Sequence, residues 1–163
     1  MATQETRNTE AGNQGGATQV VLFQLAGKSF AVELGQVEQI IDYRAPAKTP
    51  RRPVCVEGVA EYRGRYLAIV DLRKRFGVTE EKPAHPAVLV LRGVGPDPVV
   101  GLVVDQVLRV LPLPPDGVLR PPPRVFGIRA EYIRGVANAA GRPLVWLDLA
   151  KVLTSQEAIT LLA

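Results

Sequence analysis

Two stretches decide the fold, because the second repeats the first: GVAEYRGRYLAIVDLRKRF (58–76) and GVANAAGRPLVWLDLAKVL (135–153). A looser repeat lies upstream, where FAVELGQVEQII (30–41) matches VGLVVDQVLRVL (100–111). The chain is therefore predicted to form two related lobes, and its function is sought where the copies differ. Without gaps, the downstream copies share nine identities: Gly58/Gly135, Val59/Val136, Ala60/Ala137, Gly64/Gly141, Arg65/Arg142, Leu67/Leu144, Asp71/Asp148, Leu72/Leu149 and Lys74/Lys151.

Each downstream copy contains the signals of a hairpin followed by a short helix. In the first copy, residues 59–62 and 66–70 are predicted strands, joined at Arg63-Gly64, where glycine supplies the positive φ of a tight turn. Asp71 precedes the next segment, so its carboxylate is predicted to cap a helix that ends at Gly77.

Outward from the repeat, alternating apolar residues predict further strands. Residues 21–34 predict a hairpin with its turn at Gly27-Lys28 and Leu34 still in the second strand, and 37–41 a third strand. AVLVLRG, VVGLVVD and VLRVL in the second half are apolar on both faces, which predicts strands covered on both sides. Many short strands with one-turn helices predict small β-barrels, because closure removes exposed strand edges.

The predicted organisation follows from composition along the chain. Residues 1–17 are polar and predict a disordered tail. Lobe 1 is placed at about 18–80 and lobe 2 at about 86–154, with exchange of the last strands between the lobes left open. SQEAITLLA (155–163) is predicted to form an amphipathic C-terminal helix.

The net charge of +4 arises from 20 Lys and Arg against 16 Asp and Glu. The basic residues are spread out, and the short clusters Arg51-Arg52 and Arg73-Lys74-Arg75 are predicted to be solvated faces, so nucleic-acid binding is disfavoured. No apolar run approaches the roughly 18 to 20 residues that cross a bilayer. The absence of a secretory pattern and the single Cys55 favour a cytoplasmic location.

Side chains suited to catalysis are scarce. His85 is the only histidine and lies in the segment between the lobes, and Cys55 is flanked by valines as a small buried residue would be. One histidine and one cysteine do not make a zinc site of ordinary spacing. The chain is therefore predicted to be no enzyme, with no catalytic residues, metal or cofactor.

A binding surface is the remaining expectation. Tyr62 and Arg63 stand where the second copy has Ala139 and Ala140. Arginine and tyrosine are favoured interface anchors, and the guanidinium suits a carboxylate or backbone carbonyls. From these features alone, a solvated turn residue is an equally good interpretation of Arg63.

Several motifs in order resemble the CheW chemotaxis coupling-protein family over about residues 18–154. They are the V-x-x-I pattern (37–40), GV...RG...DL (58–72), GLVVDQV (101–107), LRPPP (119–123) and YIRGV (132–136) with its closing LDL. The resemblance implies a mainly β fold of two pseudo-symmetric, five-stranded SH3-like barrels with short helices. It also implies an adaptor between the cytoplasmic tip of chemoreceptors and the regulatory domain of a CheA-type histidine kinase, able to join arrays and reaching membranes only through receptors.

The resemblance also assigns partner-binding residues. Arg63 matches the family's functionally sensitive arginine, Gly58 the glycine that opens the block, and Val37 and Val107 the apolar positions that face partners.

The sequence departs from the family at Glu38-Gln39, where the usual acid is displaced by one residue, and at Arg109, where an acid is replaced. These departures motivate one alternative hypothesis, that the chain serves a pathway controlling pili, development or surface sensing. The alternatives are a module of a larger signalling protein and an SH3-like module for peptide or RNA. The predicted partner-binding residues are Val37, Glu38, Gln39, Gly58, Tyr62, Arg63, Val107 and Arg109.

Overall fold

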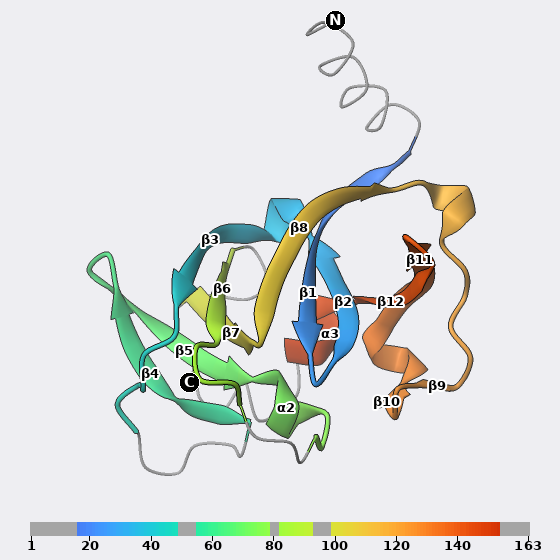
Figure 1. Ribbon diagram of the computed structural model, residues 1–163. Helices are drawn as coiled ribbons and strands as arrows, with labels where there is room; N and C mark the ends of the chain where they lie inside the picture. Colours follow the sequence, from blue (N-terminus) through green and yellow to red (C-terminus); the bar gives the residue numbers. More distant parts are fainter. Residues whose placement is uncertain (1–15, 49–54, 79–81, 93–98, 154–163) are drawn as a thin grey trace, which may run out of the picture.

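A computed structural model describes residues 16–48, 55–78, 82–92 and 99–153, and shows a mainly β protein (Figure 1). Its strands are β1 Thr18–Leu25, β2 Lys28–Glu33, β3 Val37–Asp42, β4 Val56–Tyr62, β5 Arg65–Asp71, β6 Ala87–Leu91, β7 Val99–Val104, β8 Gln106–Leu113, β9 Arg124–Val125, β10 Ile128–Arg129, β11 Ile133–Ala139 and β12 Arg142–Leu147. The helical segments are the short α2 Leu72–Arg75 and α3 Leu149–Leu153, with 3-10 turns η1 Leu34–Gln36, η2 Pro115–Gly117 and η3 Ala130–Tyr132.

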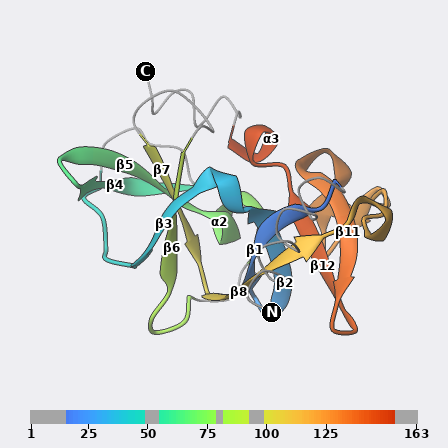
Figure 2. The same cartoon turned by 90° about the horizontal axis from the view of Figure 1, so that it is seen from above.

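The strands form two five-stranded sheets, which confirms the predicted fold class. Sheet A has the order β11-β12-β2-β1-β8, and sheet B has the order β3-β6-β7-β5-β4. β9 and β10 make a separate two-stranded hairpin. Figure 2, seen from above, shows the two sheets as neighbouring lobes.

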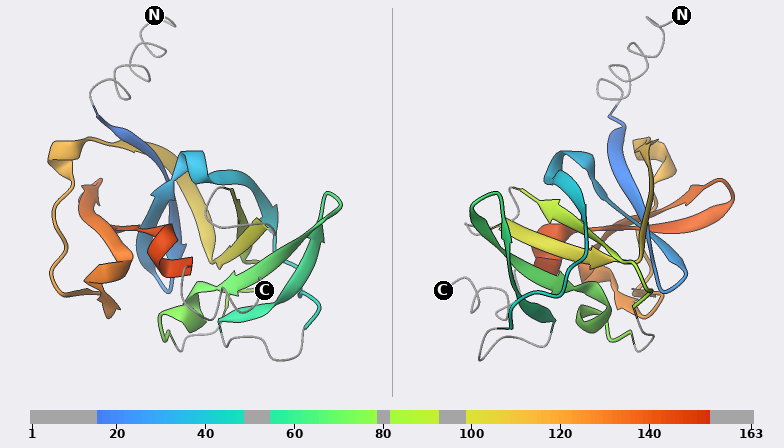
Figure 3. Two further views of the ribbon diagram at one scale, coloured as in Figure 1. Left: turned by 180° about the vertical axis from the view of Figure 1, so that it is seen from behind. Right: turned by 60° about the vertical axis from the view of Figure 1, so that its left-hand side comes forward.

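The two sheets have the same plan, although each is built from both halves of the chain. Strands β4 and β5 of sheet B correspond to β11 and β12 of sheet A, and the pairs β5·β7 and β12·β2 are both parallel. Sheet A takes its hairpin β1–β2 from the first half and β8, β11 and β12 from the second, whereas sheet B takes β3, β4 and β5 from the first half and β6–β7 from the second. The blue and orange-red ends of the chain accordingly lie together (Figures 1 and 3).

Three apolar clusters form the core, one shared by the two sheets and one belonging to each sheet, and strand alternation decides which residue enters which cluster. In β1, Val21 and Phe23 point into a large core that both sheets share, while Val20 and Leu22 point into the core of sheet A. Sheet B has its own core, which includes Tyr62, and α3 packs into the shared core. The lobes therefore share one continuous apolar interface.

The first hairpin differs from the sequence predictions in two local details. The first turn lies at Ala26-Gly27, one residue earlier than predicted, with φ of 53° and 77°. Leu34 leaves the strand and begins a 3-10 turn instead. The predicted turn at Arg63-Gly64 is confirmed, with φ of 50° and 76°. The predicted C-terminal helix (155–163), most of the predicted tail and Arg51-Arg52 lie outside the described residues.

Candidate partner-binding surface

Strand β3 and the tip of the β4–β5 hairpin form one polar surface at the free edge of sheet B. The Tyr62 hydroxyl donates a hydrogen bond to Oε1 of Gln39 over 2.5 Å. Nη2 of Arg65 lies 3.1 Å from Oε2 of Glu38. Because β3 and β4 are opposite edges of the sheet, the Tyr62–Gln39 contact joins two edges that no backbone ladder connects, and Arg65 adds a contact from the start of the neighbouring strand β5. They fix the position of the hairpin tip relative to β3.

Arg63 stands at this tip and is exposed. Its guanidinium carbon lies 5.3 Å from the centre of the Tyr62 ring, in a cation–π contact. Tyr62 is 7% exposed, so the ring is a fixed support for the arginine. No carboxylate pairs with Arg63 in the part of the chain that the structure describes. The guanidinium is thus presented toward solvent with its donors available to a carboxylate or to backbone carbonyls.

Four of the eight sequence-predicted residues, Glu38, Gln39, Tyr62 and Arg63, are therefore placed in one group. The other four do not belong to this group. Val37 is buried in the shared core, and Val107 is half-buried against it. Gly58 is buried beneath the segment after β3, because a Cβ there would lie 2.2 Å from the carbonyl oxygen of Ala47. Arg109 is exposed on β8, at the edge of sheet A.

Several exposed apolar side chains extend the surface, and the sequence did not single them out. Ile40 of β3 is 46% exposed and Tyr66 of β5 is 62% exposed.

The prediction that VLRVL is covered on both faces is wrong, since Leu108 and Val110 are exposed on β8. The reason is topological: β8 is an edge strand, whereas the similar sequences of β6 and β7 lie inside sheet B.

A groove of about 730 Å³ opens beside β3. Ile41, Ile69 and Val88 contribute apolar lining, and Asp42, Arg44 and Glu61 supply charged groups of both signs. The groove lies between β3 and β4, where the sheet edges are not hydrogen-bonded to each other. Together with Ile40, this makes the free edge of sheet B a partly apolar surface with a polar margin, as interfaces commonly are.

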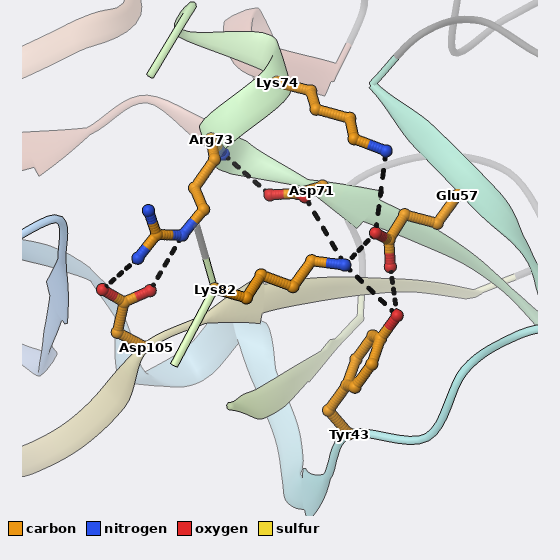
Figure 4. Close-up of polar contacts among 7 residues, drawn as sticks. All are labelled: Tyr43, Glu57, Asp71, Arg73, Lys74, Lys82 and Asp105. Atoms are coloured by element: carbon orange, nitrogen blue, oxygen red, sulfur yellow. Dashed lines mark hydrogen bonds and ion pairs between the residues drawn. The ribbon is translucent and has the colours of Figure 1, made fainter. Parts of the chain in front are cut away.

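The short helix α2 follows β5, at the end of that strand opposite the β4–β5 tip, and its Arg73 and Lys74 make polar contacts (Figure 4). As predicted, Asp71 caps it, accepting a hydrogen bond from the Arg73 backbone N–H over 2.9 Å. The prediction that Arg73-Lys74-Arg75 is a solvated face is wrong for Arg73, which is 5% exposed and paired with Asp105. Arg75 also turns inward, donating from Nε to the Val152 carbonyl and from Nη2 to the Tyr132 hydroxyl.

A second polar group fastens the segment before β6 to the rest of sheet B (Figure 4). Lys82 donates to the buried carboxylate of Glu57 and, over 3.2 Å, to the Tyr43 hydroxyl, which in turn donates to Glu57 over 2.7 Å. Burial alone raises the pKa of Glu57, but the hydrogen bonds from Lys82 and Tyr43 outweigh it and hold that pKa below its usual value. Burial alone lowers the pKa of Lys82, but its contacts with Glu57 and Tyr43 raise it overall.

Within the described ranges, the structure contains no group of three His, Cys, Asp or Glu side chains placed to hold a metal ion. His85 is exposed and Cys55 is buried, each in an environment that matches the sequence interpretation. Among the described helices, none has the length and apolar character needed to cross a membrane.

A comparison with known protein families identifies the family of the chain. Residues 19–157 match the model of the CheW-like domain. The chain belongs to this family. The CheW scaffolding protein of Thermoanaerobacter tengcongensis has a similar solved structure, with a TM-score of 0.77 and 25% identity, covering 86% of this chain and 90% of that protein. The family resemblance seen in the sequence motifs is thereby confirmed.

Relatives come from more than one kind of system. The chemotaxis protein CheW of Treponema pallidum is 30% identical over 143 residues, which cover 85% of this chain and 84% of that CheW. The protein PilI of Pseudomonas aeruginosa is 31% identical over 125 residues, covering 77% of this chain and 68% of PilI. FrzA of Myxococcus xanthus is 34% identical over 113 residues, covering 69% of this chain and 61% of FrzA.

Proposed function

We propose that the chain is a non-catalytic coupling adaptor, which joins the cytoplasmic tip of a chemoreceptor to the regulatory domain of a CheA-type histidine kinase. It works in the cytoplasm and meets the membrane only through its receptors. The observation that carries the proposal is the free edge of sheet B, where an exposed arginine stands on a fixed aromatic ring beside exposed apolar side chains. Membership of the CheW-like family supports it, since its named relatives include chemotaxis proteins.

The mechanism is geometric. The lobes share an apolar core and are tied at α2, so the chain presents surfaces on both lobes as one rigid body. A receptor bound to one surface and a kinase bound to another are then held at a fixed distance and angle. Of the described ionisable groups, the most strongly buried are engaged in structural ion pairs and a helix cap, which is the arrangement of a scaffold.

We also propose that the pathway served is not a standard flagellar one. The polar contacts of the candidate surface run from Arg65 to Glu38 and from Tyr62 to Gln39, so Glu38 is used by Arg65 and leaves Arg63 available. A partner of this surface would therefore meet an unpaired cation at the hairpin tip. Similarity to PilI and FrzA supports an alternative pathway.

The test is a reconstitution with defined partners. The full chain is mixed with the kinase regulatory domain and a receptor cytoplasmic fragment encoded in the same genome, and complexes are measured by sedimentation and by kinase autophosphorylation. The proposal expects a ternary complex in which the chain is required for receptor control of the kinase. Binding to neither partner would refute it, and turnover of a metabolite by the purified chain would refute the non-catalytic part. Equal affinity for partners from an unrelated flagellar pathway would refute the pathway assignment.

A further inference from the structure

A small aromatic pocket lies far from Arg63, where three segments of the chain meet. It has a volume of about 220 Å³ and is lined by residues of the β1–β2 turn, of the segment after α2 and of the β9–β10 hairpin. In Figure 1, β9–β10 and the β4–β5 tip lie at opposite sides of the molecule. The lining residues are Leu25, Ala26, Lys28, Phe30, Phe76, Gly77, Val78, Phe126 and Ile128.

Aromatic rings form the walls of this pocket. Phe30 is fully buried and stacks on Phe76 with ring centres 6.4 Å apart. The Phe126 ring meets Phe30 edge to face at 6.1 Å. Phe126 nevertheless remains 37% exposed. A half-exposed ring over a cavity is a surface that a partner side chain can cover.

The backbone conformation of Phe126 is strained, so a large ring at this position costs conformational free energy. Phe126 occupies the first central position of the Phe126-Gly127 turn with a φ of +52°. A bulky residue is a genuine outlier in this left-handed region, with a penalty of about 1 to 2 kcal/mol. Ala140 takes the same conformation, with a φ of 51°, in the turn between β11 and β12. The turn itself therefore does not need a large ring, and strain of this kind gathers at sites that clamp ligands.

The charges around the pocket select the kind of segment that would bind. Nζ of Lys28 lies 5.5 Å from the centre of the Phe126 ring, and Arg124 donates to the Gly127 carbonyl at the same turn. Neither cation forms an ion pair with another described residue, and none of the described lining residues carries a carboxylate. Asp105, which accepts a hydrogen bond from Ala26 N, is already paired with Arg73. The margin is thus basic and uncompensated.

We propose that this Phe126 pocket is a second docking site, which takes one large apolar side chain from an acidic segment of a partner protein. The apolar side chain enters between Phe30, Phe76 and Phe126, and carboxylates beside it pair with Lys28 and Arg124. An anchor in an aromatic pocket with charges at its margin is a common organisation of energetic hot spots. The site is independent of the surface around Arg63, so its failure would leave the proposed function standing.

The test uses a displayed library of random twelve-residue peptides, panned against the full chain. The proposal expects enriched peptides with Leu, Phe or Trp next to Asp or Glu, and these are synthesised for titration calorimetry. Phe126→Gly removes the ring and relieves the backbone strain, so the fold is retained. Binding should weaken at least tenfold in Phe126→Gly and in Lys28→Glu. Ala140→Gly, the same change in the matching turn, should leave affinity unchanged.

Other outcomes overturn the proposal. Peptides that bind Phe126→Gly as well as the unmodified chain would show that they use another surface. Enrichment of basic peptides, or no enrichment, would exclude the proposed chemistry. Peptide binding that appears only after deletion of residues 154–163 would show that the chain's own C-terminal segment, and not a partner, is the occupant. Thermal unfolding of each variant verifies that loss of binding is not loss of fold.

Discussion

Arg73 and Asp105 form a two-pronged ion pair between the lobes. Nε of Arg73 lies 3.1 Å from Oδ1 of Asp105, and Nη2 lies 2.5 Å from Oδ2. Asp105 also accepts from Ala26 N over 2.8 Å, at the tip of the hairpin that starts sheet A. One carboxylate therefore joins the end of sheet B to the first hairpin of sheet A, and bidentate charge-assisted contacts of this kind are among the strongest polar interactions in proteins.

Removing the arginine should be costly. Arg73→Met leaves the Asp105 carboxylate without its cationic partner, so the free energy of unfolding should fall by about 3 kcal/mol, as for other broken buried pairs. Urea unfolding measures this free energy. The matched control is Arg129→Met, because the Arg129–Glu131 pair is exposed and its loss should change stability by less than about 0.5 kcal/mol. Equal effects of the two changes would show that burial of the Arg73 pair adds nothing.

The Lys82–Glu57 contact predicts a pH dependence of stability. Because the folded-state pKa of Glu57 lies below its usual 4.5, its stabilising effect is complete above about that pH and is lost as pH falls through the folded value. The raised pKa of Lys82 acts in the opposite direction, so its stabilisation is present below 10.5 and is lost as pH rises through the folded value.

Lys82→Met tests this dependence. The variant should be less stable by about 2 kcal/mol between pH 6 and 9, since Glu57 loses its main partner, and the difference should shrink below about pH 4. Urea unfolding across this range gives the curve. A difference that did not shrink at any pH below 4.5 at which both proteins still fold would mean that Lys82 stabilises the fold through packing and not through charge.

Gly58→Ala should destabilise the edge of sheet B. A Cβ at this position would lie 2.2 Å from the Ala47 carbonyl oxygen, which accepts a hydrogen bond from Val59 N over 2.9 Å. The clash separates the two segments, with an expected loss of about 2 kcal/mol. Gly64→Ala is the control, since nothing lies near its Cβ and only the positive φ opposes the change, at about 1 kcal/mol. Denaturant midpoints compare the two, and a smaller effect at Gly58 than at Gly64 would contradict the clash.

Arg63→Ala should separate binding from folding. Ala140 already occupies the equivalent turn position with nearly the same φ, so alanine fits this backbone. The unfolding midpoint should be nearly unchanged, while affinity for receptor or kinase should fall by more than about 1 kcal/mol. Arg142→Ala, an exposed arginine beside the matching turn, should bind normally. Unchanged affinity of Arg63→Ala for both partners would remove Arg63 from the site.

The duplication, the turns and the helix cap could be predicted from the sequence. Contacts between residues far apart in the chain, and the order of strands in each sheet, could not. Turns and caps depend on neighbouring residues, so Arg63-Gly64 and the Asp71 cap were predictable. The pairing of Glu38 with Arg65 was missed because Arg65 is repeated as Arg142 and so resembled a residue needed only for folding. The exposure of Val110 was missed because the apolar residues of β8 resemble those of the central β6 and β7, although Arg109 sets β8 apart and sheet order makes it an edge strand.

The exchange of hairpins between the two sheets has a consequence for synthesis on the ribosome. Sheet B is complete once Val104 has emerged, because all its strands lie between Val37 and Val104. The first hairpin, although made earliest, must wait for β8, β11 and β12, and its Val20 and Leu22 side chains stay without their final neighbours until then. Sheet B, once folded, can cover one face of the first hairpin. Synthesis from the N-terminus therefore favours a fixed order of assembly in which sheet A is completed last.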